Sequence, residues 1–99
     1  MYYNYYMRFL WDLDKNNLLK KHRNISFEQI VFSIENKQIV DVMENPNQEK
    51  YSGQVFIMAE VDNYIYVVPA SISDSGEECY LRTIYPSRKY TNKYLRSRK

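Results

Sequence analysis

The spacing of hydrophobic and polar residues changes several times along the chain, and its first part predicts a strand followed by a helix. Residues 5–11 (YYMRFLW) combine aromatic and apolar side chains with one arginine, which is typical of a strand at or near a sheet edge. Asp12 follows as an N-cap, and a helix is predicted from there to about His22. Its apolar face is narrow, formed by Leu18 and Leu19, so we expect this helix to be short and half exposed.

A second helix has a stronger beginning. Ser26 and Gln29 stand three residues apart and form a capping-box pattern, in which each side chain bonds the backbone N–H of the other residue. Apolar residues then recur at helical spacing on one face: Phe27, Ile30, Val31 and Ile34. This face is predicted to pack into the core, with Leu18 of the first helix at its rim.

The rest of the chain has the spacing of strands up to a last helix. Four runs have strand character: 37–44, 54–61, 64–71 and 79–85. Asp62 and Asn63 suit a tight hairpin turn, while Pro86 and Ser87 end the last strand and cap a helix over about 88–97. The predicted fold class is α+β: an antiparallel sheet of four or five strands, with the two early helices packed on one face and a short C-terminal helix.

Length and composition narrow the possible classes of protein. The 99 residues predict a single domain, with 96–99 as a frayed basic tail. Two glycines exclude a Gly-rich phosphate loop, and a single cysteine, Cys79, excludes an internal disulfide and a cysteine-based zinc cluster. No apolar run approaches the ~20 residues that a membrane span needs, and the N-terminus lacks the apolar core of a signal peptide. We therefore expect a cytoplasmic protein without contact with a membrane.

The formal net charge of +2 conceals a strong segregation of charge along the chain. Residues 1–23 contain five Lys/Arg and two acids, residues 24–81 contain two Lys and ten acids, and residues 82–99 contain seven Lys/Arg and no acid. If the two ends meet in space, they form one basic surface on an acidic body, as expected for a ligand that is a nucleic acid or a phosphate. The alternative is that the basic ends are simply solvated.

Two segments, one from each end, resemble a known family. FLWDLDKNNLLKKHRNISFEQ (9–29) resembles the opening segment of the BrnT-type toxins, roughly F-x-W-D, a Lys three residues later, then K-H and S-F-E. LRTIYPSRKYT (81–91) resembles their closing strand and the start of their last helix, an Arg-x-Ile strand followed by an S/A-R-K-A-T segment. The resemblance covers about residues 7–95, with the order of elements kept.

What this resemblance implies is a RelE-like fold and a specific activity. Such toxins belong to type II toxin–antitoxin pairs and cleave RNA without a metal or another cofactor. A small DNA-binding antitoxin, a ribbon-helix-helix protein or a similar repressor, silences them. The expectations are therefore an endoribonuclease, an RNA substrate and a cognate antitoxin as partner.

His22 is the first candidate for the chemistry of RNA cleavage. Metal-free cleavage needs a group that takes the proton from the 2′-hydroxyl, and an unperturbed histidine titrates near neutrality. Its cationic neighbours favour the neutral imidazole, the form that a general base requires; they are Lys20, Lys21 and Arg23. The alternative is that this histidine merely caps the last carbonyls of its helix.

Arg88 and Lys89 are candidates for binding a phosphate. They follow Ser87 at the start of the last helix, where the helix dipole already places partial positive charge. A bound phosphate would relieve the resulting repulsion and would accept backbone N–H bonds. The alternative is that both side chains simply extend into solvent.

The remaining candidates are cations and one tyrosine. Arg82 lies in mid-strand, so it either pairs with an acid or points into a site. Lys15, Lys20 and Lys21 are predicted phosphate contacts, although lysines on a helix are usually solvated. Tyr85, one residue before the turn, is predicted to bind RNA by stacking on a base or donating a proton.

These residues define one hypothesis about the site. His22, Arg82 and Arg88 form the predicted catalytic set, and together with Lys21 and Lys89 they are predicted to converge on one phosphate. No metal ligand is predicted. Two other functions stay open: a catalytically inactive interaction module that keeps the fold and the partner surface, and a general RNA-binding protein.

Overall fold

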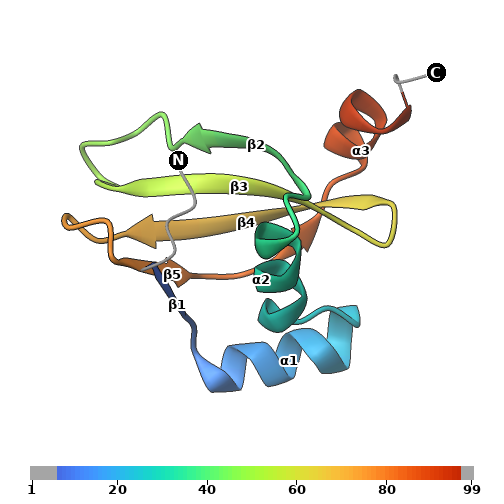
Figure 1. The fold of residues 1–99 in the computed structure, drawn as a ribbon, viewed down its shortest axis with the longest axis horizontal. Coiled ribbons are helices and arrows are strands. Elements are labelled where there is room, and N and C mark those ends of the chain that lie inside the picture. Colours follow the sequence, from blue (N-terminus) through green and yellow to red (C-terminus); the bar gives the residue numbers. More distant parts are fainter. Residues whose placement is uncertain (1–6, 97–99) are drawn as a thin grey trace.

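The described part of the chain is an α+β domain (Figure 1). The computed structural model describes residues 7–96. In chain order the elements are β1 (Arg8–Leu10), α1 (Leu13–Arg23), α2 (Phe27–Glu35), β2 (Ile39–Glu44), β3 (Gln54–Val61), β4 (Tyr64–Ile72), β5 (Glu78–Leu81), β6 (Tyr85–Pro86) and α3 (Arg88–Tyr94). The predicted order of elements is confirmed, except that the predicted last strand, 79–85, is divided into β5 and β6. Residues 5–6 of the predicted first strand and 97–99 of the predicted last helix and tail lie outside the described residues.

The two early helices begin where local side chains satisfy their first backbone N–H groups. Asp12 accepts a hydrogen bond from the backbone N–H of Lys15 at 2.9 Å, and Asn24 ends α1 in the left-handed conformation with φ of 53°. The capping box of α2 forms as predicted between Ser26 and Gln29. These short-range bonds fix both helix starts before any tertiary contact is needed.

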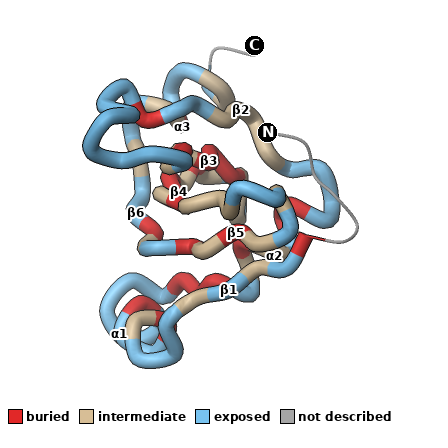
Figure 2. Tube along the Cα trace, turned by 90° about the vertical axis from the view of Figure 1, so that its left-hand side faces the viewer, coloured by how far each residue is buried: buried red, intermediate tan, exposed pale blue. Residues whose placement is uncertain are grey.

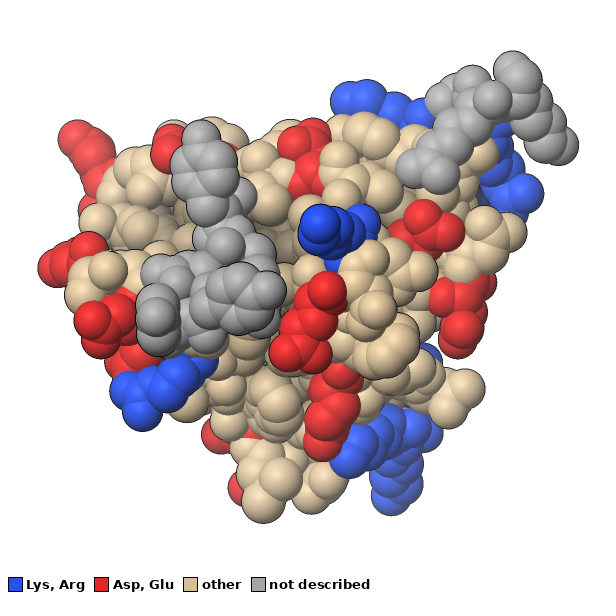
Figure 3. Space-filling model, viewed as in Figure 1, with Lys and Arg blue, Asp and Glu red and all other residues tan. Residues whose placement is uncertain are grey.

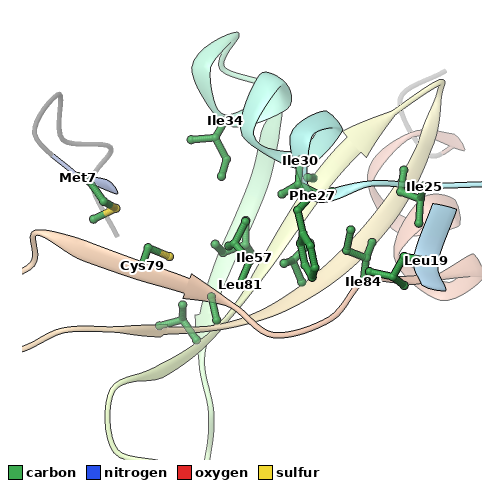
Figure 4. Close-up of a cluster of buried hydrophobic side chains, with 14 residues drawn as sticks. Met7, Leu19, Ile25, Phe27, Ile30, Ile34, Ile57, Cys79, Leu81 and Ile84 are labelled. Atoms are coloured by element: carbon green, nitrogen blue, oxygen red, sulfur yellow. The ribbon is translucent and has the colours of Figure 1, made fainter. Parts of the chain in front are cut away.

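The core face of α2 is confirmed, whereas that of α1 differs from the prediction. Phe27 and Ile30 are fully buried, and they lie among the side chains of Figure 4. On α1 the buried leucine is Leu19, while Leu18 is 52% exposed and contributes no rim to the core. Adjacent helical residues point about 100° apart, so only one leucine can face inward. The buried Asn16, three residues before Leu19, shares the inward side.

The sheet is mixed rather than antiparallel. Its order is β1-β5-β4-β3-β2, with β6 pairing β4 as a sixth strand. All neighbouring pairs are antiparallel except β1 and β5, which run parallel. The prediction of a purely antiparallel sheet of four or five strands is therefore wrong at this edge. Two helices follow β1, so no hairpin sets its direction, and it pairs at long range with β5.

The helices α2 and α3 lie on opposite faces of the sheet. Along β4, Val68 and Ala70 belong to the core that α2 covers, while Ile65 and Val67 belong to a second cluster beneath α3. In Figures 1 and 2, α1 lies below the sheet beside β1, and α3 lies at the other end. α2 therefore packs on one face as predicted, whereas α1 reaches the core at the lower edge through Leu19. None of the helices in residues 7–96 is long and apolar enough to cross a membrane.

Candidate nucleic-acid interface

His22 lies on one flank of α1 and lines a hollow of about 210 Å³. The hollow is lined by Lys15, Leu18, Leu19, His22 and Arg23. Lys15 and His22 are seven residues apart, which places them on the same side of the helix. The structure thus brings together two of the predicted site residues, and both belong to a single helix.

Asn16 and Lys20 of α1 contact the start of α2. Asn16 is fully buried; its side-chain oxygen accepts from the backbone N–H of Phe27 at 2.8 Å, and its amide donates to Glu28 at 2.8 Å. Lys20 Nζ lies 3.8 Å from the same carboxylate. The pKa of Glu28 is lowered, chiefly because Asn16 donates to its charged form. Lys20 is therefore turned towards an acid, away from the hollow.

Arg23 joins the end of α1 to the closing segment of the chain. Its Nη1 donates to the carbonyl oxygen of Ile84 at 2.5 Å, between β5 and β6. This bond was not predicted, because in the sequence Arg23 is notable only as a cationic neighbour of His22. The bond places the two segments that carry the family resemblance against each other, although they are separated by more than half of the chain.

Arg82 lies on the sheet face that carries α3. Its neighbour Leu81 is buried in the core beneath α2, so Arg82 and Tyr80 point to the other face. The Arg82 guanidinium carbon lies 4.3 Å from the centre of the Tyr80 ring, and Nε donates to Ser71 Oγ at 3.3 Å. Among the described residues, the Arg82 guanidinium contacts a ring and a hydroxyl, and no carboxylate there pairs with its positive charge.

Tyr85 faces the same side as Arg82 because the strand is irregular between them. Ala70 pairs with Leu81 and Val67 pairs with Tyr85, so β4 advances three residues while the partner chain advances four. One extra residue is therefore inserted, as in a β-bulge. Tyr85 lies opposite Val67, whose side chain is on the α3 face, and Tyr85 is 40% exposed.

Arg88 and Lys89 begin α3, as predicted, and both are exposed. Ser87 caps this helix by accepting from the backbone N–H of Tyr90, and Lys89 Nζ lies 5.4 Å from the centre of the Tyr90 ring. The buried Thr91 accepts from the backbone N–H of Ile65, which anchors α3 to β4. The helix spans seven residues and is shorter than the predicted 88–97.

The predicted site residues therefore fall into two groups. The α1 group consists of Lys15, Lys20, Lys21 and His22, and the closing-segment group consists of Arg82, Tyr85, Arg88 and Lys89. Figures 1 and 2 place α1 and α3 at opposite ends of the domain. In Figure 3 the basic side chains of the two ends lie apart, at the lower and upper right. The structure therefore does not bring the five side chains of the hypothesis together at one point; they are Lys21, His22, Arg82, Arg88 and Lys89.

Within residues 7–96, no group of three or more His, Cys, Asp or Glu side chains is arranged to hold a metal ion. No protein-family model and no curated protein matches the chain significantly.

Proposed function

We propose that the protein is a metal-independent ribonuclease toxin with a RelE-like fold, similar to the BrnT-type toxins, and that a small DNA-binding antitoxin neutralises it. The observation that carries this proposal is the hydrogen bond from Arg23 to the Ile84 carbonyl. It joins the end of α1, where His22 lies, to the segment that bears Arg82 and Tyr85. The motifs on which the resemblance rests are thereby neighbours in space.

The separation of the two groups suggests how an RNA strand is held. An extended single strand carries a phosphate at every nucleotide, so successive phosphates contact different groups. His22 exchanges a proton with the 2′-hydroxyl beside the scissile phosphate. Arg82 and Arg88 bind neighbouring phosphates through planar pairs of N–H donors, and Tyr85 offers its exposed ring for stacking on a base.

A second candidate function is RNA binding without cleavage, and one observation favours it. The hollow beside His22 includes Lys15 and Arg23, but of the described residues it includes none from the closing segment. Arg82 and Arg88, which are proposed to hold phosphates, do not line it, and cleavage at His22 would be weak without their help because the transition state needs stabilising cations. In that case the domain is an RNA-binding or partner-binding module.

Induced expression in a bacterium distinguishes these functions. The wild type is compared with His22→Ala, Arg88→Ala and the control Lys37→Ala, which removes a cation outside both groups. We expect the wild type and the control to stop growth and degrade RNA. Both site variants should grow, because removing one transition-state donor typically costs ~2.7–4 kcal/mol. Normal growth with intact RNA on expression of the wild type contradicts the toxin proposal and favours the binding module.

Antitoxin binding has a separate test. Co-purification with the product of a neighbouring reading frame should yield a complex whose stability falls with rising salt. Elution of the two proteins as separate species at low salt contradicts this part of the proposal.

A further inference from the structure

Phe32 is exposed on a helix whose other large apolar side chains face the core. It is 63% exposed, whereas Phe27, Ile30 and Ile34 of the same helix are buried. A single exposed aromatic residue is ordinary on a protein surface. Phe32, however, lines a groove, so its ring lies beside the other residues of that groove.

The groove lies between α2 and the turn that joins β3 to β4, and encloses about 460 Å³. Its lining residues are Glu28, Gln29, Phe32, Ser33, Gln38, Val61 and Asp62. In Figure 1, α2 lies in front of the sheet and the β3–β4 turn is the loop at the right. Its size falls in the range of pockets that bind small molecules or single side chains of a partner.

Backbone and side-chain bonds hold the two walls together. Ser33 Oγ donates to the carbonyl oxygen of Glu60 at 2.9 Å, which links α2 to β3. Gln38 N–H donates to the Ser33 carbonyl, and the Gln38 carbonyl accepts from the backbone N–H of Glu60. The groove is therefore formed before any ligand binds, so binding costs little conformational entropy.

The lining has the chemistry of a site for a cationic side chain. Phe32 and Val61 are apolar, Glu28 and Asp62 carry carboxylates, and none of the described lining residues is a lysine or arginine. Glu28 is partly neutralised by Lys20, at 3.8 Å, whereas Asp62 lies on the exposed turn. An aromatic ring next to carboxylates favours a cation with a flat or apolar body, which describes arginine and lysine.

The charge around the groove points to a protein partner. Figure 3 shows the face that carries α2, with acidic side chains over and around this helix. Residues 24–81, which include the whole lining, contain ten acids and two lysines. Such a surface repels nucleic acids and anionic lipids and attracts a basic polypeptide.

We propose that the groove between α2 and the β3–β4 turn docks a basic segment of a partner protein, whose arginine or lysine side chain lies over Phe32 and pairs with Asp62. This inference is independent of RNA cleavage. The groove is on the α2 face of the sheet, and Arg82 and α3 are on the opposite face. A partner in the groove therefore leaves Arg82 and α3 open.

The proposal is tested with a synthetic peptide as the probe. The peptide consists of repeats of Arg-Leu-Ala with blocked ends, and its control has Glu in place of every Arg. Binding to the isotope-labelled full chain is followed by the NMR shifts of backbone amides. We expect the basic peptide to shift amides of the groove lining, with an affinity that falls as salt is added, and the acidic peptide to have no effect.

Three variants separate the groove from diffuse attraction. Phe32→Ala removes the ring, and Asp62→Asn removes one charge while keeping a residue type that tolerates the positive φ of 51°. Asp74→Asn removes one charge from an exposed turn outside the groove. We expect Kd to rise about fivefold in the first two variants and to stay within about twofold in the third. Shifts spread outside the lining, no binding of the basic peptide, or equal losses in all three variants would overturn the proposal.

Discussion

The Nη1 atom of Arg23 donates a hydrogen bond to the carbonyl oxygen of Ile84 and so joins the end of α1 to the chain between β5 and β6. Ile84 is fully buried in the same core cluster as Leu19 of α1. Apolar packing and a hydrogen bond from a charged donor thus both hold the end of α1 against the chain at Ile84. The relative position of His22 and the closing segment depends on this contact.

Replacing Arg23 with alanine should weaken that junction. The loss of a charged donor to a carbonyl predicts a decrease of about 1–2 kcal/mol in the free energy of unfolding, because Arg23 is largely at the surface. Lys21→Ala, which removes a neighbouring exposed cation, is the matched control and should change stability by less than about 0.5 kcal/mol. Urea unfolding measures both variants. Equal stabilities of the two variants would show that the hydrogen bond contributes nothing.

Asn16 should be the most sensitive polar position of α1. Its side chain is fully buried and satisfies the backbone N–H of Phe27 at the start of α2. Asn16→Ala leaves that N–H buried without a partner and should cost about 1–3 kcal/mol. The neighbouring Asn17 is exposed, so Asn17→Ala serves as the control. Similar urea midpoints for the two variants would contradict this role of Asn16.

The hydrogen bond from Asn16 also predicts how Glu28 titrates. The folded-state pKa of Glu28 is lowered from 4.5, first of all by this bond. The carboxylate therefore adds stability at a pH above 4.5, and this contribution is lost as the pH falls through the folded-state pKa. NMR titration of the carboxyl carbon should show the pKa of Glu28 rising towards 4.5 in Asn16→Ala. An unchanged titration curve would assign the shift to another cause.

Cys79 should be inert to thiol reagents in the folded protein. Its side chain is fully buried, and burial raises the pKa of the thiol to about 11. Little of the reactive thiolate therefore exists near neutral pH. A colorimetric thiol assay should give no reaction in buffer and one thiol per chain in concentrated urea. Rapid labelling in buffer would show that the strand β5 opens locally.

The parts of the fold that the sequence predicts are those with local causes. The start of α2 follows from Ser26 and Gln29, which stand three residues apart, and its core face follows from the helical spacing of Phe27 and Ile30. The order of elements follows from the changes of spacing and from the turn residues. Each of these features depends on side chains within a few positions of one another.

The features that the sequence did not predict depend on long-range contacts. The parallel pairing of β1 with β5 joins residues about 70 positions apart, such as Arg8 and Glu78. The choice of Leu19 over Leu18 as the buried residue depends on the side of α1 that meets the core, to which Asn16 also belongs. Spacing within one helix leaves both leucines possible.

In the candidate site, too, the sequence predicts only those relationships that depend on residues close together in the chain. Lys15 and His22 share a flank because seven residues are two helical turns. The common orientation of Arg82 and Tyr85 depends on the extra residue between them, since a regular strand would place them on opposite faces. The positions of α1 and α3 at opposite ends of the domain are a tertiary property, which the spacing of residues along the chain does not predict.

Cleavage of RNA by His22 without a metal is tested by a cleavage assay with purified protein. End-labelled single-stranded RNA is incubated with wild type and with His22→Ala in the presence of excess EDTA. We expect the wild type to produce fragments ending in 2′,3′-cyclic phosphate, because the 2′-hydroxyl is the nucleophile. His22→Ala should be slower by about 10²–10⁴-fold while retaining its fold. Intact RNA with the wild type, or equal cleavage by both proteins, would contradict it.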